Sequence, residues 1–103
     1  MDRTPAVYIV ASGRNGTLYA GVTSDLSGRI YQHRTKAFHG FSAKHGCNRL
    51  VWYEVHEEME PAIVREKRIK EWKRAWKLEL IEATNPTWRD LAEDLGFDPL
   101  PSP

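Results

Sequence analysis

Two short runs of apolar residues near the start of the chain are separated by a turn sequence. Residues 6–11 (AVYIVA) and 17–22 (TLYAGV) are rich in β-branched and aromatic side chains, which is typical of strands. Between them, Asn15-Gly16 provides the positive-φ positions that a tight turn requires. We therefore predict a β-hairpin. Residues 49–56 (RLVWYEVH) predict a third strand, whereas residues 38–48, with two glycines and no helical period, predict a long loop.

Two further stretches have helical spacing. Ser24 or Asp25 can cap a helix that runs to about residue 36. Its apolar stripe, which also includes His33, contains Leu26, Ile30 and Ala37. A longer pattern starts at Pro61, a residue suited to the first turn of a helix, and runs to about residue 83 with a break near 74–77. Its predicted buried stripe contains Ala62, Ile69, Trp72, Trp76 and Leu80.

This order of elements predicts one α/β domain over residues 1–95, in which helices flank a small three-stranded antiparallel sheet. A last short helix is expected over 87–95, and residues 96–103 are expected to form a loose proline-rich tail. A chain of 103 residues has room for one core, and four tryptophans exclude wholesale disorder. There is no membrane-length apolar run and no signal-peptide pattern. Cys47 is the single cysteine, which suggests a reducing compartment, so we expect a cytoplasmic protein. We also expect a monomer.

Charge is distributed unevenly, although the formal net charge is only +1. Residues 65–77 carry seven basic and two acidic side chains, and residues 79–103 carry one basic and six acidic ones. Residues 26–53 contain no acidic side chain. A net charge near zero argues against a strongly basic nucleic-acid binder, but the basic segments can meet phosphates. We expect basic residues to surround the functional site and the acidic segment to lie elsewhere.

Several polar residues interrupt the apolar patterns. Glu66 lies inside the apolar stripe of its helix, where it needs either an ion pair with a basic neighbour or a role as metal ligand or catalytic acid. Arg29 and His33 are four residues apart, so they share a helix face. Such a pair suits charge stabilisation and proton transfer, or forms a partly exposed helix face. Tyr8 and Tyr19 stand on paired strands, where a tyrosine is usually core but can serve as a base beside a cation.

Two weaker patterns have simpler explanations. Trp72 and Trp76 lie among lysines and arginines, as on a nucleic-acid surface, but their helical spacing favours a place in the core. One loop contains three residues of metal-ligating types whose spacing matches no standard zinc site: His39, His45 and Cys47.

Together these elements resemble the GIY-YIG nuclease superfamily, in particular its small standalone bacterial proteins. The paired motifs correspond to Val7-Tyr8-Ile9 and Tyr19-Ala20-Gly21, with the two tyrosines eleven residues apart. Thr23-Ser24-Asp25-Leu26, followed by Arg29 and His33, resembles the next helix of the family. Ala62 to Trp72 resembles its glutamate helix, and Asn85-Pro86-x-Trp88-x-Asp90-Leu91 resembles the end of the standalone proteins. The sequence departs from the family pattern at Ala6-Val7, Ala20, Val22 and Leu78.

The resemblance implies hydrolysis of phosphodiester bonds with one divalent metal ion, Mg²⁺ or Mn²⁺. It implies that Glu66 binds the metal, Tyr8 is the general base, and Tyr19 positions the water or phosphate. Arg29 would stabilise the charge of the transition state, and His33 would assist proton transfer. The expected substrate is DNA, branched or damaged, in repair or recombination, with a protein partner for targeting. The basic residues expected to contact it are Arg34, Lys36, Lys44, Arg65 and Lys70.

Two other functions fit parts of this pattern. One is a nucleic-acid-binding module with little or no cleavage activity, and the other is a protein-interaction domain that uses the basic face and acidic tail. The complete set of five candidate residues favours the nuclease, because a binding module has no need of the metal-binding glutamate.

Overall fold

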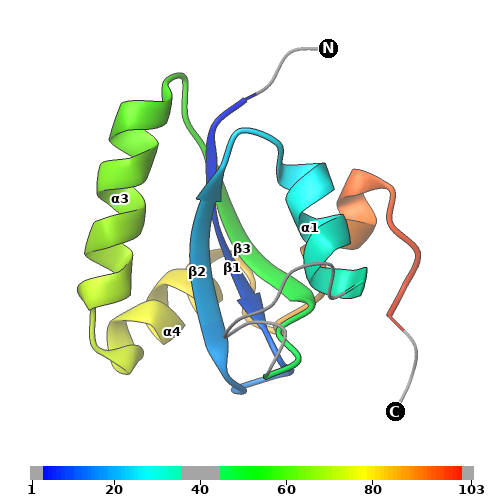
Figure 1. The fold of residues 1–103 in the computed structure, drawn as a ribbon. Helices are drawn as coiled ribbons and strands as arrows, with labels where there is room; N and C mark the ends of the chain where they lie inside the picture. Colours follow the sequence, from blue (N-terminus) through cyan, green and yellow to red (C-terminus); the bar gives the residue numbers. More distant parts are fainter. Residues whose placement is uncertain (1–3, 36–44, 101–103) are drawn as a thin grey trace.

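A computed structural model describes residues 4–35 and 45–100 of the chain. Its centre is a three-stranded antiparallel sheet in the order β2-β1-β3 (Figure 1). The strands are β1 (Ala6–Ala11), β2 (Leu18–Thr23) and β3 (Arg49–Val55). The predicted hairpin is confirmed, and β1 is the central strand, bonded to both neighbours.

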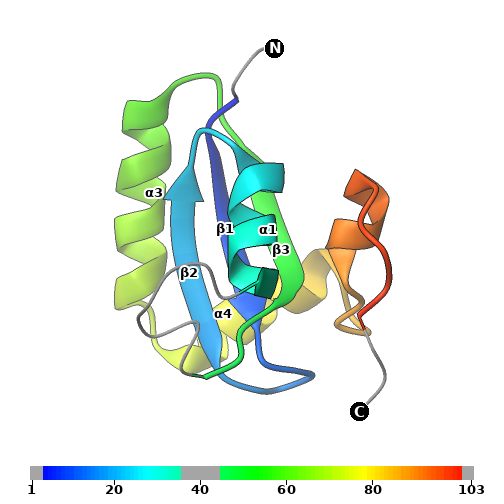
Figure 2. The ribbon, with the colours of Figure 1, turned by 45° about the vertical axis from the view of Figure 1, so that its right-hand side comes forward.

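Helices cover both faces of the sheet (Figures 1 and 2). They are α1 (Leu26–Thr35), α3 (Met59–Glu71), α4 (Arg74–Thr84) and the short 3₁₀ helix η1 (Leu91–Leu95). The α3 and α4 helices pack on one face, and α1 and η1 pack on the other. This arrangement confirms the predicted fold class.

Strand alternation divides the interior into two apolar clusters. Side chains of successive residues point to opposite faces of a sheet, so Val7 and Ile9 lie on the α3 side while Tyr8 and Val10 lie on the α1 side. The first cluster is joined by Ile69 of α3 and by residues of α4, and the second by residues of α1 and η1. Tyr8 is therefore part of the core beneath α1.

The long predicted helix is divided where the chain leaves helical geometry at Trp72 and Lys73, which have ψ angles of 147° and 156°. The predicted break is thus confirmed but lies just before 74–77, and α3 begins at Met59 rather than at Pro61. Because the chain leaves helical geometry there, the spacing of the α3 stripe does not carry through to Trp76, although Leu80 of α4 packs on the same cluster as Ile69. The prediction that Trp76 lies in the core is wrong, since 48% of its surface is exposed.

The helix predicted over 87–95 is present only in part, as the 3₁₀ helix η1. Asn85 accepts a hydrogen bond from the Arg89 backbone N–H and donates to the Arg89 carbonyl, which closes the chain into a turn. Trp88 within that turn has a φ of 58° and is fully buried. The packed region also extends beyond residue 95, since Phe97 packs on the cluster under α1 and Asp98 accepts a hydrogen bond from Arg34.

Candidate functional site

The five residues expected to form the site come from four elements around β2, an edge strand of the sheet. Tyr8 is on β1, Tyr19 on β2, Arg29 and His33 on α1, and Glu66 on α3. The α1 and α3 helices flank this edge on opposite faces (Figures 1 and 2).

The best-defined contact of the site joins Tyr8 to His33. The Tyr8 hydroxyl lies 2.9 Å from His33 Nε2, and both side chains are buried. The His33 ring meets the Tyr8 ring edge-on at a centroid distance of 5.4 Å, and it meets the tilted Tyr19 ring at the same distance. Three rings from three elements are thus packed around one hydrogen bond.

Gly21 makes room for this arrangement and was not singled out as a site residue. It is the cross-strand partner of Tyr8 in the β1–β2 register, and the Tyr8 ring lies over it. A Cβ at Gly21 would lie 2.4 Å from the Tyr8 hydroxyl oxygen and 2.5 Å from Cζ, which is too close for any side chain. The hairpin register, which pairs the first tyrosine with the last residue of the second motif, is the signal that could have identified it.

Burial controls the protonation of the pair. It raises the pKa of Tyr8 well above its ordinary value, an effect that the Arg29 charge opposes and that Tyr19 and Glu66 reinforce. Burial also lowers the pKa of His33 to about 4, with a further contribution from Arg29. At neutral pH the phenol is therefore protonated and the imidazole is neutral. A neutral imidazole has one nitrogen that accepts a proton, so the pair can pass a proton between its partners.

Glu66 faces the same edge from α3 and is mostly covered, with 12% of its side chain exposed. Its Oε2 lies 3.1 Å from Nζ of Lys70, one turn further along the helix. The ion pair anticipated as the simpler explanation of Glu66 is thus present. Lys70 Nζ also lies 5.6 Å from the centre of the Tyr19 ring, which connects the carboxylate to the tyrosine cluster.

The donor set at this edge fits one kind of metal site. Within the described parts of the chain, no group of three or more His, Cys, Asp and Glu side chains could enclose an ion. A single carboxylate suits Mg²⁺ or Mn²⁺, which keep several waters and take further oxygens from a phosphate. Cys47 is buried with its thiol 3.5 Å from the Thr17 carbonyl, and His39 lies outside the described residues. The structure therefore gives no support to the zinc alternative.

Comparison with known proteins identifies the family of the chain. The model of the GIY-YIG catalytic domain family matches residues 4–79, which include all five candidate residues. The chain belongs to the GIY-YIG family. GIY-YIG proteins form a superfamily of nucleases, which generally use divalent metal ions.

Other GIY-YIG proteins are similar over most of this chain. UPF0213 proteins of Staphylococcus aureus strains Mu3 and Mu50 are each 33% identical to it over 76 residues, which cover 74% of this chain and 92% of theirs. The solution NMR structure of a UPF0213 protein from Bacillus halodurans superimposes with a TM-score of 0.54. That match covers 87% of this chain and 95% of the other at 24% identity, so it shows a shared fold.

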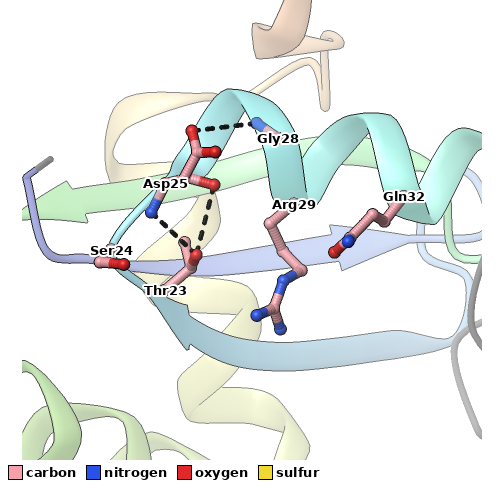
Figure 3. A pocket seen from close by; sticks show the side chains of 6 residues that line it. All are labelled: Thr23, Ser24, Asp25, Gly28, Arg29 and Gln32. Atoms are coloured by element: carbon pink, nitrogen blue, oxygen red, sulfur yellow. Dashed lines mark hydrogen bonds between the residues drawn. The ribbon is translucent and has the colours of Figure 1, made fainter. Parts of the chain in front are cut away.

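A small hollow of about 190 Å³ opens beside Arg29, where β2 leads into α1 (Figure 3). Asp25 shapes it by accepting a hydrogen bond from the Gly28 backbone N–H at 3.2 Å, while Thr23 Oγ1 accepts one from the Asp25 N–H at 3.0 Å. Gly28 leaves space for the Asp25 carboxylate, which would lie 2.3 Å from an added Cβ. The hollow brings a guanidinium to an open polar surface next to the tyrosine cluster, an arrangement that suits a phosphate of the GIY-YIG substrate.

The basic residues expected to contact DNA have diverse surroundings. Arg34 is mostly covered, where it pairs with Asp90 and donates to the Asp98 carbonyl. Arg65 pairs with Glu54 at 3.1 Å and remains partly exposed. Lys70 borders the site, as described. Lys36 and Lys44 lie outside the described residues.

The last helix of the acidic C-terminal segment lies away from the candidate site. The η1 helix, with Glu93 and Asp94, packs on β3 and α1, away from α3 and the β2 edge (Figure 1). The site is therefore not covered by η1. None of the described helices is long and apolar enough to cross a membrane.

Proposed function

We propose that this GIY-YIG protein is a metal-dependent endonuclease that hydrolyses phosphodiester bonds in DNA and serves repair or recombination. The observation that carries the proposal is the buried Tyr8–His33 hydrogen bond, on which the charges of Arg29 and Glu66 both act. A neutral imidazole bonded to a buried phenol, with the charges of Arg29 and Glu66 acting on that phenol, suits proton transfer.

The pair offers a path for the proton of the attacking water. Burial makes a free Tyr8 phenolate costly, so Tyr8 takes the water proton as its own proton passes to His33 Nε2. The phosphorus–oxygen bond to water forms as the bond to the leaving oxygen breaks. The leaving oxygen takes a proton from solvent, and His33 holds the proton that Tyr8 released. Neither step requires a long-lived phenolate.

The remaining residues handle charge and position. Arg29, which lines the open hollow, would neutralise the negative charge that grows on the phosphate in the transition state. Tyr19, stacked near His33, would position the water or the phosphate. Glu66 would hold the divalent cation, Mg²⁺ or Mn²⁺, which when bound stabilises charge on the phosphate oxygens. Lys70 would then release Glu66 and become available to the DNA.

The proposal is tested by incubating the protein with plasmid, single-stranded and branched DNA in Mg²⁺, Mn²⁺ or EDTA. We expect metal-dependent cleavage, which Glu66→Gln reduces by at least about a hundredfold because it removes the charged ligand. Glu71→Gln is the matched control, an exposed glutamate near the end of the same helix, and should cleave within twofold of wild type.

Two results would contradict the proposal. Wild-type protein that binds DNA but cleaves none of these substrates would favour the nucleic-acid-binding module. Equal cleavage by wild type and Glu66→Gln would indicate a contaminating nuclease and remove the support for this site.

A further inference from the structure

An exposed tryptophan stands at the corner where α3 meets α4. Trp76 contacts Trp72 in a T-shaped arrangement with ring centres 6.2 Å apart, so part of its indole is packed and part faces solvent. Lys73 Nζ lies 5.3 Å from the centre of the Trp76 ring. The helix break thus presents an aromatic surface with a cation beside it.

This corner is tied to the sheet. Arg74 donates hydrogen bonds of 2.8 and 2.7 Å to the carbonyls of Asn15 and Gly16 in the β1–β2 turn. Lys77 Nζ lies 3.4 Å from the Lys70 carbonyl, which links the two helices across the break. The corner between α3 and α4 is therefore held next to the start of β2 (Figures 1 and 2).

The corner is continuous with the β2 edge of the sheet, where the proposed catalytic residues lie. Lys70 contacts both Glu66 and the Tyr19 ring, and the break follows two residues later. The rise of about 1.5 Å per helical residue places Trp72 roughly 9 Å along α3 from Glu66.

We propose that Trp76 stacks on an unpaired base of the DNA strand close to the cleaved bond, while Lys73 and Lys77 contact the adjacent phosphates. This inference rests on the proposed function. Aromatic rings stack on bases of any sequence, and lysines next to them attract the backbone. The face of an indole is reached only by a base that is out of the double helix, so the substrate would carry an unpaired segment beside the cleavage site.

The test is a binding measurement in EDTA, which prevents cleavage. Fluorescence anisotropy compares a labelled blunt duplex with the same duplex carrying a single-stranded flank. We expect Trp76→Ala to weaken binding of the flanked DNA by about five- to a hundredfold, and binding of the blunt duplex by less than twofold. Trp76→Phe should retain most of the affinity. Val64→Ala is the control, since Val64 is a half-exposed apolar residue on α3, and this variant should bind both DNAs like wild type.

Each other outcome would overturn the inference. An equal loss on both DNAs, or no loss on the flanked one, would exclude base stacking by Trp76. A change in sedimentation of Trp76→Ala without DNA would show that the corner instead binds a second copy of the chain. If wild type shows Glu66-dependent cleavage while Trp76→Ala binds the flanked DNA like wild type, the stacking inference fails and the proposed function stands. If wild type neither binds nor cleaves DNA, the proposed function fails with it.

Discussion

Two polar clusters of the molecule use buried polar groups differently. The first, which we propose as the catalytic edge, has the Tyr8–His33 bond at its centre. The second, which we call the C-terminal clamp, consists of Arg34, Asn85 and Asp90. Asp90 pairs with Arg34 and accepts hydrogen bonds from the backbone N–H groups of Leu50 and Ala92 at 3.2 and 3.1 Å.

The clamp contains a buried ion pair, whereas the two buried groups at the catalytic edge are uncharged at neutral pH. In the clamp, a carboxylate and a guanidinium hold β3, η1 and α1 together. Asn85 adds hydrogen bonds to the Val51 and Arg89 carbonyls at 3.1 and 2.8 Å. At the catalytic edge, burial disfavours the charged forms of both Tyr8 and His33. We infer that the clamp serves stability and that the edge is kept ready for proton transfer, and the following predictions test this contrast.

The largest expected effect is on the clamp. Asp90→Ala should lower the free energy of unfolding by about 3–5 kcal/mol, because it leaves Arg34 buried without its carboxylate. Urea denaturation at neutral pH measures this loss. Asp94→Ala is the control, since Asp94 forms a fully exposed pair with Arg89 and its removal should scarcely shift the urea midpoint. Equal midpoints for the two variants would show that the clamp is not a source of stability.

The next effect is a loss of stability in acid. His33 binds a proton only near pH 4 in the folded protein but near pH 6.5 when unfolded, so between these values the unfolded chain holds more protons. The stability present above pH 6.5 should therefore fall by about 3 kcal/mol as the pH drops to 4. His33→Gln should flatten this part of the profile, whereas His45→Gln should retain it. An unchanged slope in His33→Gln would contradict the burial argument.

A smaller effect is expected from Gly21→Ala. The added methyl group must displace the Tyr8 ring, which should destabilise the protein by about 1–3 kcal/mol and break the bond to His33. Cleavage should fall as well, measured at a temperature where the variant is folded. Gly13→Ala provides the control, because an added Cβ there meets nothing within 4 Å. Full activity in Gly21→Ala would mean that the precise position of Tyr8 is unimportant.

The smallest effect on stability is expected from Lys70→Ala. Lys70 is half exposed, and a pair of this kind on a helix contributes less than about 0.5 kcal/mol. The informative readout is the metal concentration for half-maximal cleavage at saturating DNA. It should decrease, because Lys70 no longer competes for the Glu66 carboxylate. An increase would show that Lys70 assists metal binding rather than opposing it.

Local sequence signals predicted the sheet and most of the site. Alternating apolar residues around Asn15-Gly16 located the hairpin, and its register brings Tyr8 opposite Gly21. Helical spacing placed Arg29 and His33 on one face of α1. Spacing alone could not predict that α1, α3 and β2 lie close together, because this depends on packing between distant parts of the chain. The resemblance to the GIY-YIG family supplied that step.

The errors have a common physical origin in backbone geometry that side-chain periodicity does not report. Extended ψ angles at Trp72 and Lys73 rotate α4, so Trp76 leaves the buried stripe. Likewise, side-chain hydrogen bonds of Asn85 favour a turn over the expected helix, and the turn buries Trp88 at a positive φ. Hydrogen bonds and contacts between distant residues decided both regions.

The central claim, that the Tyr8–His33 pair moves a proton during cleavage, is tested most directly by the single-turnover cleavage rate of Tyr8→Phe. This change removes one buried oxygen and leaves the ring in place over Gly21. We predict a rate at least about a hundredfold below wild type. The free energy of unfolding should fall by only about 1–3 kcal/mol, the cost of leaving the buried His33 Nε2 without this partner, so the rate is measured where the variant is folded. A rate equal to that of wild type in the folded variant would contradict the account.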